Sequence, residues 1–129
     1  MSTNLSPNLL IGHISAIEPI TAGDGCHLRE LLQPTLQPLG IGYSLAHASI
    51  EPGGRTIDHW LAQSEVYYII AGVGTMFLDD IGHAVQAGTY YYVPPRCRQW
   101  LRNDGDTRIE FLCIVDPSWT SDGETIVDP

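Results

Sequence analysis

Two residues able to bind a metal or transfer protons stand six positions apart in the stretch Pro52–Gly72. His59 ends a short polar segment after a Pro-Gly-Gly turn, and Glu65 heads a β-prone run that ends at Ile70. Side chains alternate along a strand, so Tyr67 should point the same way as Glu65. A turn between the two segments would bring the carboxylate back beside the imidazole. This pattern is typical of first-row metal sites, but surface polar residues beside a turn fit it too.

A second stretch, 88–103, has the spacing that complements the first. Together they resemble the cupin family, whose two motifs have fixed intervals between glycines, metal ligands and a proline. The first motif falls on Gly53, His59, Leu61, Glu65 and Gly72, and the second on Gly88, Pro94, Arg96, Gln99 and Asn103. Three positions depart from the family pattern, because Leu61 and Gln99 replace ligand histidines and Arg96 replaces a glycine. The resemblance covers about residues 46–115.

The resemblance implies a divalent-metal site made by His59, Glu65 and Gln99. In this set the amide of Gln99 would offer a neutral carbonyl oxygen, whereas Leu61 would supply nothing. The ion could be Zn, Mn, Fe, Ni or Ca. Tyr67 is a weaker candidate, as a catalytic group that helps by proton transfer. The alternative is a metal-free pocket in which Glu65 forms hydrogen bonds with Gln99 and His59.

Two classes of function follow, both involving a small molecule in the barrel. The first is a metal-dependent dioxygenase, decarboxylase, isomerase or lyase, in which the metal polarises an oxyanion or activates O₂ or water. The second is a metal-free, non-catalytic ligand-binding or dimerisation module. A sugar-nucleotide epimerase would need a His/Asp pair. The only Asp beside His59 in sequence is Asp58, which should point to the opposite strand face, so this third function is not favoured.

Composition excludes several other classes of partner. The net charge of −9 opposes binding to nucleic acid or to an anionic membrane, because phosphates would be repelled. All six cationic side chains are arginine, so no lysine Schiff base can form. No apolar run reaches membrane-spanning length. Cys26, Cys97 and Cys113 have neither zinc-site nor disulfide spacing, which favours a cytoplasmic location.

Short β-prone runs separated by Gly, Pro, Asn and Asp predict an all-β fold, a jelly-roll β-barrel or double-stranded β-helix. We divide the single domain into N-terminal edge strands (1–40), the cupin barrel core (41–116) and an acidic tail (117–129) that we expect to be flexible. Residues 26–33 also fit a short helix, but the resemblance favours an edge strand. Residues 107–115 should form the last core strand.

Small cupins commonly pair or exchange edge strands, so the resemblance also implies a homodimer. The segments expected to make that contact are 9–20 and 26–33. Three further histidines are interpreted as structural or exposed residues and not as ligands, namely His13, His47 and His83.

Overall fold

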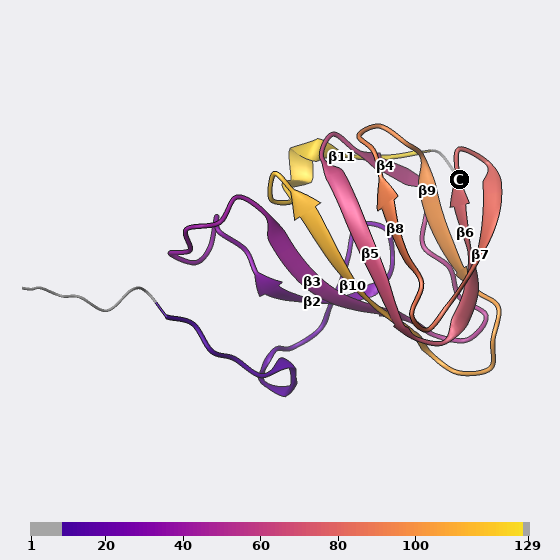
Figure 1. Cartoon of the computed structure of the whole chain (residues 1–129), viewed down its shortest axis with the longest axis horizontal. Coiled ribbons are helices and arrows are strands. Elements are labelled where there is room, and N and C mark those ends of the chain that lie inside the picture. Colours follow the sequence, from indigo (N-terminus) through magenta and orange to yellow (C-terminus); the bar gives the residue numbers. More distant parts are fainter. Residues whose placement is uncertain (1–8, 128–129) are drawn as a thin grey trace, which may run out of the picture.

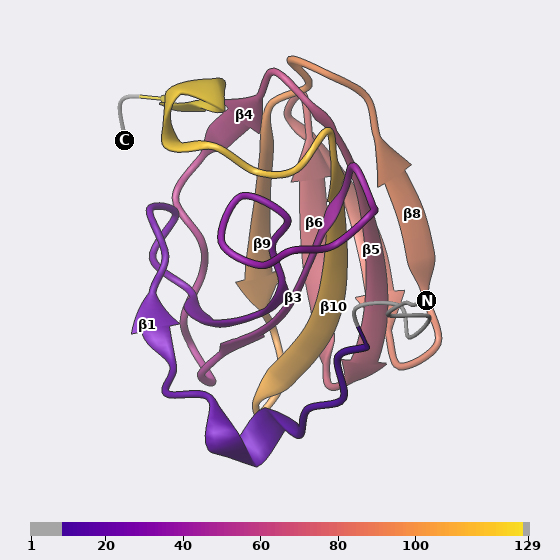
Figure 2. The same cartoon turned by 90° about the vertical axis from the view of Figure 1, so that its left-hand side faces the viewer.

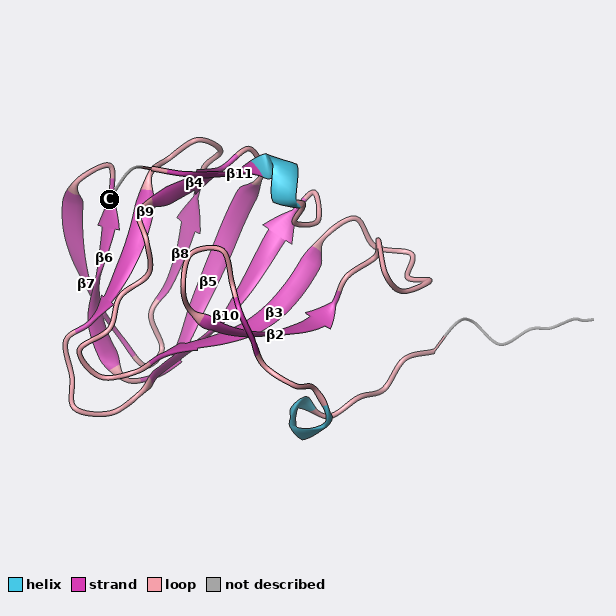
Figure 3. Ribbon diagram, turned by 180° about the vertical axis from the view of Figure 1, so that it is seen from behind, coloured by secondary structure: helices cyan, strands magenta, loops and turns pink. Residues whose placement is uncertain are grey.

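The computed structural model describes residues 9–127, and this part of the chain is built almost entirely of strands (Figure 3). Two single-turn 3-10 helices are the exceptions, η1 (Ile14–Ala16) and η2 (Ser121–Gly123). The strands are β1 (Ile20–Thr21), β2 (His27–Leu32), β3 (Ser44–Ile50), β4 (His59–Leu61), β5 (Ser64–Ala71), β6 (Val73–Leu78), β7 (Ile81–Gln86), β8 (Tyr90–Val93), β9 (Gln99–Asn103), β10 (Ile109–Asp116) and β11 (Glu124–Ile126). The predicted all-β fold is confirmed.

The strands form two antiparallel sheets that face each other as a jelly-roll barrel (Figure 1). The six-stranded sheet has the order β1-β2-β3-β10-β5-β8, and the five-stranded sheet has the order β11-β4-β9-β6-β7. Strands distant in sequence therefore become neighbours, as where β10 lies between β3 and β5. The core between the sheets includes Ile69, Met76, Leu101 and Ile109, each at most 1% exposed.

Strand β5 shows how the sequence pattern sets the inside of the barrel. Its burial alternates along the strand, with Glu65, Tyr67 and Ile69 buried and the residues between them exposed. A period of two is what a strand with one face toward the core requires. The inward direction expected for Glu65 and Tyr67 is therefore confirmed, and both side chains enter the barrel interior.

Most of the expected strands are present with small shifts at their ends. Residues 26–33 contain β2, so the helix alternative is wrong and the strand is confirmed, although the two-residue β1 pairs with it and forms the edge of the sheet. The hairpin of β6 and β7 turns at Asp79 and Asp80, and both residues have positive φ angles. This left-handed backbone is a conformation that Asp tolerates better than most residues.

Two expectations about the chain ends need correction. The tail expected to be flexible instead returns to the barrel: β11 pairs with β4, and the backbone N–H of Ala62 donates to the Gly123 carbonyl at 2.8 Å. Strand β10 is thus not the last strand. At the other end, residues 9–19 contain no strand, and the chain leads away from the barrel through η1 (Figure 1). No helix within residues 9–127 is long and apolar enough to span a membrane.

The glycines of the two motifs occupy positions that need them. Gly53, Gly72 and Gly88 all have positive φ angles. A Cβ on Gly72 would also lie 2.7 Å from the Cα of Ile109, so no other residue fits there without backbone movement. Arg96, which replaces the second-motif glycine, keeps the left-handed conformation with a φ of 67°.

Candidate functional site

A cavity of about 240 Å³ opens inside the barrel beside the inward face of β5. Among the groups of its wall that can exchange protons are His59 from β4, Glu65 from β5 and Asp24 from the loop between β1 and β2. The C-terminal segment, drawn in yellow beside β4 in Figure 2, contributes Trp119 and Glu124 to the same wall. The segment expected to be a free tail is therefore part of the site.

The imidazole of His59 is held in one orientation by the backbone. Its Nδ1 lies 2.7 Å from the carbonyl oxygen of Ile57, and a carbonyl can only accept, so Nδ1 carries a proton. The side chain is only 3% exposed, and its Nε2 lies 3.7 Å from Asp24 Oδ2 and 4.0 Å from Glu124 Oε2. Both distances exceed hydrogen-bond length. Nε2 therefore faces the cavity with two carboxylates nearby and no hydrogen-bond partner within residues 9–127.

Glu65 is the buried carboxyl group of the site. It is 6% exposed, and Gln99 donates an amide hydrogen to its Oε1 over 3.0 Å. Burial raises the pKa of Glu65 to about 8, the hydrogen bond from Gln99 opposes this rise, and the negative charges of Asp24 and Glu124 add to it. At neutral pH Glu65 is thus mostly protonated and can act as a proton donor.

The amide of Gln99 is engaged at both ends. Its nitrogen donates to Glu65, and its oxygen accepts the hydroxyl hydrogen of Tyr67 at 2.6 Å. Burial raises the pKa of Tyr67 well above its ordinary value, so the phenol stays protonated and keeps this bond. The structure therefore connects Glu65, Gln99 and Tyr67 by hydrogen bonds and pairs His59 with Gln99 across β4 and β9, but it turns the nitrogen of Gln99, and not its oxygen, toward Glu65.

This arrangement does not fit the metal site implied by the resemblance. A metal needs the amide oxygen, which Tyr67 occupies, and Leu61 adds only an apolar side chain at the position of a ligand histidine. Within residues 9–127, no three His, Cys, Asp or Glu side chains group as a metal centre requires. The ligand set of His59, Glu65 and Gln99, with any divalent ion, stays a prediction.

Sequence reasoning missed three acidic residues of the cavity wall, Asp24, Glu30 and Glu124. Burial raises the pKa of Glu30, and burial together with the charge of Asp24 raises that of Glu124, which His59 partly offsets. Asp24 is brought to the site by a backbone bond, from the Ile57 N–H to its carbonyl at 2.6 Å. The only sequence signal was the Gly-Asp-Gly turn, which gives no hint of its neighbour in space.

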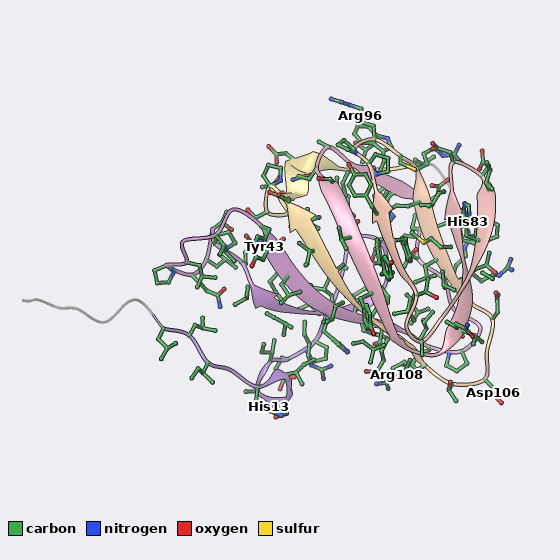
Figure 4. The ribbon with its side chains drawn as sticks, viewed as in Figure 1. His13, Tyr43, His83, Arg96, Asp106 and Arg108 are labelled. Atoms are coloured by element: carbon green, nitrogen blue, oxygen red, sulfur yellow. The ribbon has the colours of Figure 1, made fainter. Side chains whose placement is uncertain are left out.

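The remaining candidates lie outside the cavity. His13 and His83 project from the periphery (Figure 4), and His47 bonds Glu110 at 3.1 Å, so none joins His59. Asp58 is paired with Arg98 at 2.8 Å, away from the imidazole beside it in sequence. Cys26 and Cys113 line the cavity, but burial raises the pKa of both thiols, which leaves them uncharged and weakly nucleophilic.

The chemistry available here is acid–base catalysis. The proton on Nδ1 leaves Nε2 of His59 free to accept one, and Glu65 holds a proton at neutral pH. Two titratable groups with such different environments are a frequent sign of a general base and a general acid. Asp24 lies where it would stabilise the imidazolium formed when His59 takes up a proton.

Comparison with known proteins identifies the family that the spacing of the two motifs indicates. Residues 46–115 match the family described as Cupin domain. An uncharacterised protein of Methanocaldococcus jannaschii is 33% identical over 113 residues, which cover 87% of this chain and 90% of that protein.

Two solved structures illustrate the shared fold. A predicted oxalate decarboxylase from Thermotoga maritima has a TM-score of 0.73 and 20% identity, over 84% of this chain and 99% of that one. A nucleoside dehydratase from Streptomyces, also solved as a variant with uridine, has a TM-score of 0.74 and 19% identity, over 93% and 92% of the two chains. At these identities the likeness shows the fold alone.

Proposed function

Because the chain belongs to the cupin family, we propose that it binds a small molecule in the barrel cavity and catalyses a proton-transfer reaction on it. The reaction class is a lyase, such as a dehydratase, or an isomerase. The single observation behind this proposal is that one cavity wall carries both His59, whose Nε2 makes no hydrogen bond within residues 9–127, and Glu65, which is mostly protonated at neutral pH.

In this proposal His59 removes a proton from the substrate and Glu65 gives one to the departing or rearranging group. Loss of water is the simplest case: Nε2 accepts a proton from carbon, the electron pair forms a double bond, and the hydroxyl leaves with the proton of Glu65. Asp24 stabilises the imidazolium. Tyr67 and Gln99 position Glu65 through the two hydrogen bonds that connect these three side chains. Since the Gln99 oxygen is engaged, no step is assigned to a metal.

Turnover of small metabolites in D₂O tests the proposal. The full chain, purified without a tag and treated with a chelator, would be incubated with a metabolite extract and followed by mass spectrometry. We expect a metabolite that loses water or gains deuterium, and we expect neither His59→Gln nor Glu65→Gln to produce that change. Glu51→Gln, which alters an exposed carboxylate paired with Arg108, is the matched control.

Three outcomes would contradict the proposal. Turnover that needs a divalent ion restored after chelation would support the metal-dependent enzyme instead, as would metal that co-purifies and raises the melting temperature. Unchanged turnover in both variants would remove the acid–base pair. Binding of a metabolite without any turnover would identify a non-catalytic module.

We also propose that the protein is a homodimer. The outer face of β5, β8 and β10 exposes large apolar side chains that are cross-strand neighbours, with Val66 opposite both Tyr92 and Ile114, and Tyr68 opposite Tyr90. Tyr90 is 78% exposed. In the N-terminal segment, Ile11 is 86% exposed. A second copy would remove these apolar surfaces from water.

Sedimentation equilibrium tests the dimer with two charge substitutions on opposite sheets. Tyr90→Arg should shift the protein toward monomer, whereas Ile81→Arg, on the edge strand β7 of the other sheet, should leave the association unchanged. A wild-type protein that sediments as a monomer, or equal effects of the two substitutions, would contradict this interface.

A further inference from the structure

The cavity wall carries a strongly one-sided set of charges. Asp24, Glu30 and Glu124 line it beside Glu65, which is mostly uncharged at neutral pH, and none of the six arginines does. Among the wall residues within the described range 9–127, only His59 can become cationic. Buried or half-buried carboxylates are normally paired with cations, because an unpaired charge away from water is costly.

The positive partners that these carboxylates lack are engaged elsewhere. Arg98 binds Asp58 and Asp80, Arg102 binds Asp104, and Arg108 binds Glu51, all outside the cavity. Arg29 donates instead to the carbonyl of Ile17 at 2.8 Å. The distribution of ion pairs therefore leaves the barrel interior acidic.

A second, independent feature points to a ligand in this space. The Nε2 atom of His59, in a side chain that is 97% buried, is aimed into the cavity and has no hydrogen-bond partner within residues 9–127. Gaps of 3.7 Å and 4.0 Å separate it from the two nearest carboxylates. A polar atom in so buried a side chain normally has a partner, which a molecule bound in the cavity would supply.

We propose that the cavity selects small organic amines, with the ammonium group held by Asp24 and Glu124, whose carboxylates both lie within 4.0 Å of His59 Nε2, and rejects carboxylates and phosphates. The apolar part of the molecule would contact Tyr67, Phe111 and Trp119, which also line the wall. Aromatic rings attract cations as well as apolar groups, so this lining favours the same charge. A divalent ion is the other kind of cation, but residues 9–127 do not group three ligating side chains for one.

The inference depends on the proposed function, since it takes the cavity as the substrate site. It is tested by binding, without turnover, with three probes of one skeleton: 2-phenylethylamine, 2-phenylethanol and phenylacetate. Saturation-transfer NMR and calorimetry would be run on the full chain at neutral pH and low salt. We expect the amine to bind about tenfold tighter than the alcohol, and the carboxylate to bind weakest.

Charge substitutions locate the effect. Asp24→Asn and Glu124→Gln should each weaken amine binding about tenfold and leave alcohol binding unchanged, because each removes one charge and keeps the shape. Asp106→Asn is the matched control, since this exposed residue lies on a loop at the periphery of the barrel (Figure 4) and does not line the cavity. It changes the net charge by the same single unit.

Several results would overturn the inference. Equal binding of all three probes, tighter binding of phenylacetate, no binding of the amine at 20-millimolar probe, or an equal loss in Asp106→Asn would each do so. Displacement of the amine by zinc or manganese at micromolar concentration would show that the carboxylates of the wall bind a metal ion in preference to an amine. Equal binding of the three probes would contradict the amine preference but not the acid–base reaction proposed above. Turnover that does not need His59 and Glu65 would contradict that reaction but not the amine preference.

Discussion

The hydroxyl of Tyr67 donates to the Oε1 atom of Gln99 over 2.6 Å, and this bond fixes which end of the amide faces Glu65. With the oxygen engaged, the amide nitrogen must point to the carboxyl group, where it donates a hydrogen bond. The residue at the place of a ligand histidine thereby becomes a positioning group for Glu65 and not a metal ligand in this arrangement. The consequences can be tested by stability measurements that need no substrate.

Replacing Tyr67 by Phe should destabilise the fold by about 1–3 kcal/mol, because it leaves the buried oxygen of Gln99 without a donor. Tyr91→Phe is the matched control. The two rings stack with centroids 4.7 Å apart, but the hydroxyl of Tyr91 is buried without a hydrogen-bond partner within residues 9–127. Its removal should change stability by no more than about 0.5 kcal/mol. Urea denaturation measures both, and equal losses in the two variants would refute the Tyr67–Gln99 bond.

Replacing Glu65 by Gln should make stability less dependent on pH. Burial raises the pKa of Glu65 from 4.5 to about 8, so between these values the folded protein binds one more proton than the unfolded chain. Wild-type stability therefore falls as pH rises, by about 1.4 kcal/mol per pH unit from this group. The variant lacks this loss and should be the more stable protein at pH 8, with the difference shrinking toward pH 5.

Denaturation curves at four pH values between 5 and 8 would measure this difference. Glu51→Gln, at an exposed ion pair with Arg108, should follow the wild type throughout. A Glu65→Gln variant that loses stability with pH as steeply as the wild type would show that Glu65 ionises normally in the folded protein.

The sequence was sufficient to predict the parts of the site that depend on local spacing. His59 and Glu65 lie on β4 and β5, each three residues from Ala62 in the turn that joins these strands. The alternation of side chains along β5 then fixes which of them enter the barrel. The glycines at positive φ mark where the two motifs bend. Local rules such as these are carried by a single stretch of chain.

What could not be predicted depends on contacts between distant segments. Glu124 reaches the cavity because β11 pairs with β4, with Glu124 opposite Leu61, and no spacing rule links those residues. Asp24 arrives through its backbone bond to Ile57. The direction of the Gln99 amide depends on its two hydrogen-bond partners, Tyr67 and Glu65, which come from another strand. A sequence motif specifies only which position Gln99 occupies and not how its amide is turned.

Arg96 offers a test of backbone strain at the position where the family pattern has glycine. Its φ of 67° is costly for a residue with a Cβ, by about 1 kcal/mol, and more for a β-branched side chain. Arg96→Gly removes this strain but makes the unfolded chain more flexible, so its stability should stay within about 0.5 kcal/mol of the wild type. Arg96→Val should lose about 1–2 kcal/mol. Equal stabilities of the Gly and Val variants in urea would contradict the left-handed geometry.

One of the contacts that join the C-terminal segment to the barrel is a close approach between Gly123 and Gln63. A Cβ on Gly123 would lie 2.5 Å from the amide oxygen of Gln63, whose nitrogen is already bonded to the Ser118 carbonyl at 3.3 Å and the Thr120 hydroxyl at 3.1 Å. Gly123→Ala should therefore displace the buried amide and loosen the segment that carries Trp119 and Glu124.

The expected result is a loss of about 1–3 kcal/mol in stability and faster hydrogen exchange at the Ala62 amide, which donates to the Gly123 carbonyl. Gly40→Ala is the control, because a Cβ there meets no atom within 4 Å. It should change neither stability nor exchange. Unaltered exchange at Ala62 in Gly123→Ala would mean that β11 does not depend on this contact, and that other contacts, such as the strand pairing with β4 and the hydrogen bond from Gln33 to the Trp119 carbonyl, hold the C-terminal segment.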